Sequence, residues 1–198
     1  QKADNTEYCY IMRKETGDWW YHIKDLEEIR NTNVIKKFVT AAAYGVRPHV
    51  GLGPYVSGDF SENIMKYLDM MDGYLKWAAE SVFDITSGML PQCHINDGGY
   101  IVTTMRDNIH YIHILKAPSG ECTEICDGGY VFENACVLKT GDNINFRQIN
   151  GKIYFEGDFS SCEADGDFVI KLTAKGRRII KTVKPEDENV LPCSINIE

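Results

Sequence analysis

The longest periodic run of hydrophobic positions lies between Asp59 and Ile85. Apolar residues recur there at the three- and four-residue spacings of one helix face. The positions are Ile64, Leu68, Met71, Leu75, Ala79 and Val82. A short apolar segment and the Gly53-Pro54 turn precede this run, and strand-like segments fill the chain from about Gly99 onward. The pattern predicts the last helix of an α/β layer, followed by a β-sandwich.

The residues before this helix predict a strand, a helix and a second strand. Glu7 to Met12 is rich in aromatic, sulfur and β-branched side chains, and Val46 to Leu52 reads as the second strand. Asp25 and Glu28 form a capping box at the start of the helix that follows the first strand, and Gly45 is placed to end that helix. A strand–helix–strand unit makes its two strands parallel neighbours. Because parallel sheets normally have more strands, we expect either further strands from elsewhere or an irregular packing on the C-terminal part.

After Gly88 the helical period disappears and short strands alternate with turn sequences. The clearest pair, Tyr100 to Met105 and Ile109 to Leu115, flanks a tight turn. The fold class predicted is therefore α+β. A βαβα segment over residues 1–88 precedes an antiparallel β-sandwich over residues 89–198.

Composition narrows the functional classes. A net charge of −8 argues against nucleic-acid binding, and no apolar run is long enough to span a membrane. Seven cysteines are many for a cytosolic chain of 198 residues. Cys122 and Cys126 lack the spacing of a paired zinc motif, so disulfides are favoured. We expect a secreted, extracellular or lysosome-like location.

No metal or cofactor is predicted. His110 and His113 lie three positions apart in a predicted strand, so their rings should point to opposite faces. Glu163, Asp165 and Asp167 could offer oxygen ligands to Ca²⁺, although a solvated acidic turn is the more common arrangement.

The order of the elements, with several local strings, resembles the C-terminal part of family 29 glycoside hydrolases, the α-L-fucosidases. Four strings carry the resemblance: Glu7-Tyr8-Cys9 and Asp18-Trp19-Trp20-Tyr21 for the seventh barrel strand and its loop, Gly51-Leu52-Gly53-Pro54 for the end of the eighth, and Gly73 to Ile85 for the last helix. The sequence departs from the family at Gly51, which stands where the family has Asn. It also carries Arg47, Pro48 and His49 in place of aliphatic residues.

The resemblance implies that residues 1–88 are the end of a (β/α)8 barrel. The family's nucleophile and acid/base belong to barrel segments upstream of the matched part, so no catalytic residue is predicted in this chain. Carboxylates such as Glu80 read as solvated helix-surface groups.

Carbohydrate contact is predicted for Trp19, Trp20 and Tyr21, because aromatic faces stack on sugar rings and barrel loops build the active site. Arg47 and His49 could face the same mouth. The alternatives are that the rings seal their loop against the sandwich and that Arg47 and His49 are structural.

Two functions remain open. The chain could be a non-catalytic section of an α-L-fucosidase-like hydrolase, completed by a second polypeptide or a removed segment. It could instead be a stand-alone secreted carbohydrate-binding or interaction protein derived from such an enzyme, with self-association possible. In neither case is hydrolysis of fucosides expected from this chain alone.

Overall fold

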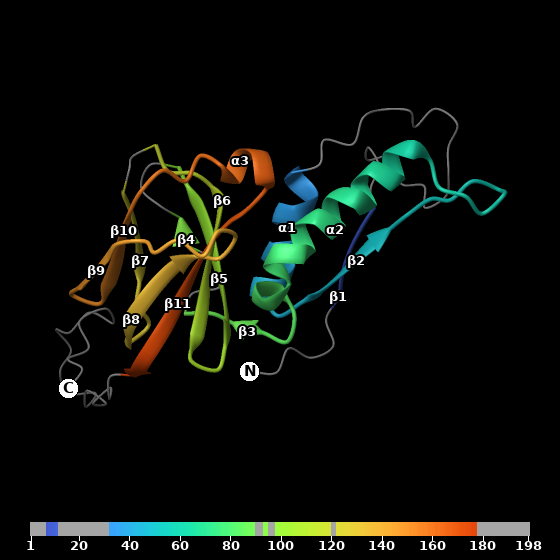
Figure 1. Cartoon of the computed structure of the whole chain (residues 1–198). Helices are drawn as coiled ribbons and strands as arrows, with labels where there is room; N and C mark the ends of the chain where they lie inside the picture. The colour runs from blue at the N-terminus through green and yellow to red at the C-terminus, as the bar shows by residue number, and fades with distance from the viewer. Residues whose placement is uncertain (1–6, 12–31, 90–92, 95–97, 120–121, 178–198) are drawn as a thin grey trace.

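The computed structural model describes residues 7–11, 32–89, 93–94, 98–119 and 122–177. Figure 1 shows two helices on one side of a central antiparallel sheet and a smaller antiparallel sheet on the other. The elements of the first half are β1 (Glu7–Ile11), α1 (Thr32–Ala43), β2 (Arg47–Gly51), α2 (Glu62–Val82), β3 (Thr86–Ser87), β4 (Cys93–His94), β5 (Tyr100–Arg106) and β6 (Ile109–Lys116). Those of the second half are β7 (Cys122–Cys126), β8 (Tyr130–Val137), β9 (Phe146–Ile149), β10 (Lys152–Glu156), α3 (Cys162–Asp165) and β11 (Phe168–Arg177).

The central sheet is buried on both faces. Its strand order is β3-β5-β6-β11-β8, with β4 also paired to β5, and the smaller sheet has the order β7-β10-β9. On neighbouring positions of β5, Val102 belongs to the core shared with α1 and α2, whereas Ile101 belongs to the core between the sheets. On β6, Leu115 likewise belongs to the core shared with α1 and α2, and Ile114 to the core between the sheets. This alternation explains why β6 reads as an almost unbroken run of buried residues.

Helix α2 begins and ends inside the predicted range. The Ser61 hydroxyl caps it by accepting a hydrogen bond from the Ile64 amide at 3.4 Å. It ends at Val82, before Asp84 adopts a left-handed backbone conformation with φ 53°. The buried side chains are Ile64, Tyr67, Met71, Tyr74, Ala78, Ser81 and Val82. The face is therefore rotated from the predicted stripe toward two tyrosines.

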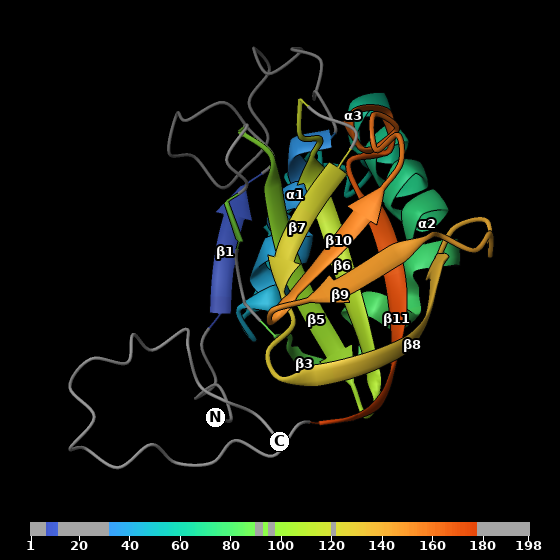
Figure 2. The same cartoon turned by 90° about the vertical axis from the view of Figure 1, so that its left-hand side faces the viewer.

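Strands β1 and β2 are parallel neighbours, as the strand–helix–strand order predicted. Their register pairs Glu7 with Arg47 and Ile11 with Gly51. Among the described residues they pair only with each other. Figure 2 shows β1 at the margin of the molecule, beside α1 and apart from the two antiparallel sheets.

The mixed α+β class with antiparallel sheets is confirmed in the described residues. The predicted helix cap at Asp25 lies outside these residues. Of the helices that the structure describes, none has the length and apolarity needed to cross a bilayer.

Candidate functional site

The first candidate site is the outward face of β2. Arg47 and His49 are exposed on one side of the strand, whereas Val50 packs against the core formed with α1 and α2. This division follows from the two-residue period of a strand. Trp19, Trp20 and Tyr21, the other predicted carbohydrate contacts, lie outside the described residues.

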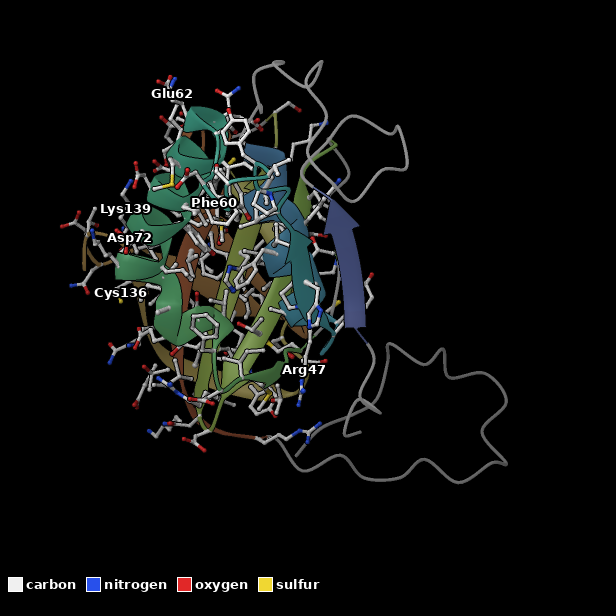
Figure 3. The ribbon with its side chains drawn as sticks, turned by 90° about the vertical axis from the view of Figure 1, so that its right-hand side faces the viewer. Arg47, Phe60, Glu62, Asp72, Cys136 and Lys139 are labelled. Atoms are coloured by element: carbon white, nitrogen blue, oxygen red, sulfur yellow. The ribbon has the colours of Figure 1, made fainter. Side chains whose placement is uncertain are left out.

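Arg47 and His49, the two described residues of this site, lie at different positions along β2. Arg47 is the first residue of the strand, and His49 is its middle residue. Figure 3 shows Arg47 far from Phe60, which precedes α2 in the loop that leaves the other end of β2. In (β/α)8 enzymes the chemistry takes place at the C-terminal ends of the strands. His49 is therefore closer than Arg47 to the end of β2 where a barrel would place substrate.

The predicted acidic turn does not form a cluster. Glu163 pairs with Lys36 at 3.4 Å and Asp165 pairs with Lys139 at 2.7 Å, so each carboxylate is directed at a different lysine. Asp167 is buried beneath α2. Within the part of the chain that the structure describes, no three His, Cys, Asp or Glu side chains are grouped closely enough to hold a metal ion.

The second candidate site is a buried chain of polar groups between α2 and the central sheet. Asp167 Oδ2 accepts a hydrogen bond from the Tyr74 hydroxyl at 2.8 Å and lies 2.7 Å from His113 Nδ1. The other ring nitrogen, Nε2, lies 3.1 Å from the Thr104 hydroxyl. That hydroxyl in turn donates to the Ser81 carbonyl at 2.6 Å. We call these five residues the His113 network.

The sequence analysis did not detect the His113 network. Its members come from α2, β5, β6 and the turn before β11, and Tyr74 and Asp167 are 93 positions apart. The available signal was the presence of two polar residues, Thr104 and His113, at strand positions that the alternation assigns to the helix-covered face.

The order Thr104–His113–Asp167 is that of a nucleophile, a base and an orienting carboxylate. Two observations exclude that chemistry here. The Thr104 hydroxyl donates to a carbonyl and not to the imidazole, and both Thr104 and His113 are fully buried, so no substrate can reach them. The network positions α2 on the sheet.

His110 lies on the opposite face of β6, as the strand spacing predicted. Its ring is 4.2 Å from that of Tyr130 and 5.2 Å from that of Phe132, measured between centroids. It is fully buried, and neither ring nitrogen has a hydrogen-bond partner among the described residues. Burial, followed by the charge of Arg177, lowers the pKa of His110 to about 4, so the ring is neutral in the fold.

Charged groups also join α2 to the sheet. Glu80 pairs with Lys171 at 2.7 Å and with Arg106 at 3.7 Å. The expectation that Glu80 is simply solvated was therefore wrong, because its carboxylate bridges α2 to β11 and β5.

The described cysteine side chains form no disulfide. Cys126, Cys136 and Cys162 are free thiols, whereas the predicted disulfides would also involve side chains outside the described residues. Cys162 is fully buried, and burial raises the pKa of its thiol to about 11.

No protein-family model and no curated protein matches this sequence. Solved structures of fucosidases do match the fold. The α-fucosidase of Thermotoga maritima is 16% identical, with a TM-score of 0.70 over 84% of this chain and 39% of that chain. The α-L-fucosidase isoenzyme 1 of Paenibacillus thiaminolyticus is 19% identical, with a TM-score of 0.70 over 85% of this chain and 39% of that one.

A bacterial fucosidase solved with a phenyl-triazole inhibitor that carries a dihydroxy-methylpyrrolidine ring is 19% identical, with a TM-score of 0.73 over 89% of this chain and 39% of that chain. Identities this low establish likeness of fold alone. The chain thus shares its fold with α-L-fucosidases, and it spans about two fifths of the length of the solved structures that it matches.

Proposed function

We propose that this chain is the C-terminal, non-catalytic section of an α-L-fucosidase-like glycoside hydrolase. One observation carries the proposal: β1 and β2 form a parallel sheet of two strands whose outer edges have no partner strand among the described residues. The likeness to fucosidases over about two fifths of their length agrees with it.

The physical argument concerns the outer edges of β1 and β2. A strand at the edge of a sheet presents unpaired N–H and C=O groups, and parallel sheets are stable when further strands continue the ladder. In a closed barrel each strand has two neighbours, and helices cover its outer side. Val50 of β2 already packs against the core shared with α1 and α2. The side of β2 that carries Arg47 and His49 would then face the barrel interior.

Residues 1–88 would form the last sector of the barrel, and residues 89–198 the sandwich that supports it. The nucleophile and the acid/base would lie on a completing segment, carried either by the same protein or by a second polypeptide. Trp19, Trp20 and Tyr21 would contact the glycan, with His49 deeper in the mouth and Arg47 at the far end of β2.

The second candidate is a stand-alone carbohydrate-binding or interaction protein. The exposed side chains of Arg47 and His49 favour it, because barrel interiors are normally filled by branched aliphatic residues. Polar side chains on this side of β2 agree with a β1–β2 pair that remains exposed to solvent.

Reconstitution tests the proposal. The purified chain is assayed with a fluorogenic fucoside, alone and together with a polypeptide carrying the missing barrel strands and their carboxylates. We expect no turnover by the chain alone and measurable turnover by the mixture, with a stoichiometric complex in native mass spectrometry. Turnover by the isolated chain would contradict the proposal, and so would a lone monomer that binds glycans without any completing strands.

A further inference from the structure

The His113 ring is held at both nitrogens. Nδ1 lies 2.7 Å from Asp167 Oδ2, and Nε2 lies 3.1 Å from Thr104 Oγ1. Both His113 and Asp167 have fully buried side chains, and each of the two contacts joins the groups directly. The protonation state of the ring can therefore be derived by counting donors and acceptors.

The count begins at Thr104. Its hydroxyl has one proton, and the Ser81 carbonyl 2.6 Å away can only accept it. Ser81 is the second-last residue of α2, where carbonyls lack an amide partner within the helix. With its proton committed to Ser81, Thr104 can only accept from the imidazole. Nε2 must then carry a hydrogen.

The Nδ1 side leads to the same result. Burial and the Asp167 carboxylate raise the pKa of Tyr74 well above its ordinary value, so the phenol keeps its proton and donates it to Oδ2. Asp167 is thereby held as an acceptor. In a buried carboxylate–imidazole contact the carboxylate stays ionised and accepts the hydrogen bond, so the hydrogen between the two groups belongs to Nδ1.

We infer that His113 is a buried imidazolium with both ring nitrogens protonated, and that this charge fastens the end of α2 to the central sheet. Two groups of opposite sign stabilise the positive charge of His113. Asp167 supplies the counter-ion, and the C-terminal end of α2, reached through Thr104 and Ser81, carries the partial negative charge of the helix dipole.

The other ionisable groups on this face do not compete for the proton. Glu80 of α2 is neutralised by Lys171 of β11 and Arg106 of β5, and Lys36 of α1 pairs with Glu163 of α3. Two groups stay protonated and uncharged. Burial raises the pKa of Tyr111 on this face of β6, and also that of Cys162 on α3, which lies in the core between the sheets.

Loss of the Nε2 hydrogen of His113 would disrupt its contact with Thr104. If Nε2 lost its hydrogen, two acceptors would face each other at 3.1 Å, unless Thr104 abandoned the Ser81 carbonyl. The contact between Thr104 and His113 therefore depends on a hydrogen at Nε2. His110, three positions away on the other face of β6, is neutral and has no such partners.

Nitrogen-15 NMR of the histidine rings tests the inference on the whole chain. At about pH 7.5, where a histidine in water is neutral, we expect two protonated ring nitrogens for His113, both protected from exchange with solvent. His110 should show one protonated and one bare nitrogen in the same spectrum. A bare nitrogen on His113 at that pH would overturn the inference.

Two substitutions at Thr104 separate the charge from simple packing. Thr104→Val keeps the shape and removes the hydroxyl, so His113 should lose one of its two ring protons. Thr104→Ser keeps the hydroxyl and should retain both. Equal spectra for the two variants would contradict the role of Thr104. If Thr104→Val does not fold, the spectrum of the unaltered protein still decides the protonation state.

Discussion

At the scale of single residues, strand β6 places two histidines in opposite surroundings. His113 has a partner at each nitrogen, whereas His110 lies among the rings of Tyr130 and Phe132 without any. A buried polar group without a hydrogen bond costs about 1–3 kcal/mol. The spacing in the sequence predicted that the two rings point apart. It could not predict the partners, which arrive from segments far along the chain.

His110 makes a prediction about acid stability. Its pKa of about 4 in the fold is below the value of roughly 6.5 expected in the unfolded chain, so the unfolded state binds more protons between these values. The stability contribution is complete above about pH 6.5 and falls as the pH drops toward 4, by up to about 3 kcal/mol. Urea titrations across this range should show a shallower fall for His110→Leu than for the unaltered protein.

The comparison at neutral pH is the control, because both proteins then have an uncharged side chain at this position. Parallel pH curves for the two proteins would show that His110 does not bury its ring in the neutral form.

The free thiols predict a graded reactivity. Cys126 is exposed and should react with a thiol reagent in the folded protein. Cys162 is fully buried with a pKa of about 11, so it should react only after unfolding. Peptide mapping after labelling, with and without denaturant, distinguishes the two. Labelling of Cys162 in the folded protein at the rate of Cys126 would contradict the described packing.

At the scale of elements, helix α2 shows which features of a helix the spacing of apolar residues predicts and which it does not. The apolar spacing predicted its existence and approximate length, but its buried face is centred on Tyr67, Tyr74 and Ala78. Tyrosine has both apolar and polar character in a sequence pattern, and the pattern does not show the Asp167 carboxylate that accepts the hydrogen bond of the buried Tyr74 hydroxyl. The ends depend on local geometry, through the Ser61 cap and the left-handed Asp84.

Two glycines on neighbouring elements make opposite predictions. A Cβ at Gly73, in the middle of α2, would meet no atom within 4 Å, whereas one at Gly88 would lie 2.2 Å from Thr103 Oγ1 and 2.6 Å from its backbone carbon. Gly73→Ala should therefore stabilise the fold by about 0.5–1 kcal/mol through helix propensity. Gly88→Ala should lower the melting temperature, because β5 would have to move.

Thermal melts of the two variants measured side by side provide the check. Each serves as the matched control for the other, since both add one methyl group. A Gly88→Ala variant as stable as the parent would mean that the β3–β5 approach is looser than described.

At the scale of the whole molecule, the order of elements predicted a parallel strand pair, a helix against it and antiparallel strands beyond. It did not predict which strands are neighbours. Strand β11 lies between β6 and β8, and β10 lies between β7 and β9. Such pairings depend on contacts between distant segments, which a reading of local patterns does not contain.

The open ribbon of β1 and β2 makes a prediction for the whole molecule. Amides of β2 that point away from β1 have no strand partner among the described residues, so they should exchange with solvent much faster than amides of β6, which has a neighbour on each side. Hydrogen exchange followed by mass spectrometry measures both strands in one experiment. A completing polypeptide should slow exchange in β2 and leave β6 unchanged; protection of β2 in the isolated chain would contradict the open edge.

The position of β11 has a consequence for synthesis. Residues Phe168–Arg177 fill the gap between β6 and β8, although β6 ends at Lys116 and β8 at Val137. During synthesis on the ribosome, the edges of β6 and β8 that pair with β11 therefore have no partner until residues 168–177 have been made. Their exposed backbone invites wrong pairing during that interval, so folding should be slow and should gain more from a chaperone that shields nascent strands than from one that acts on finished domains.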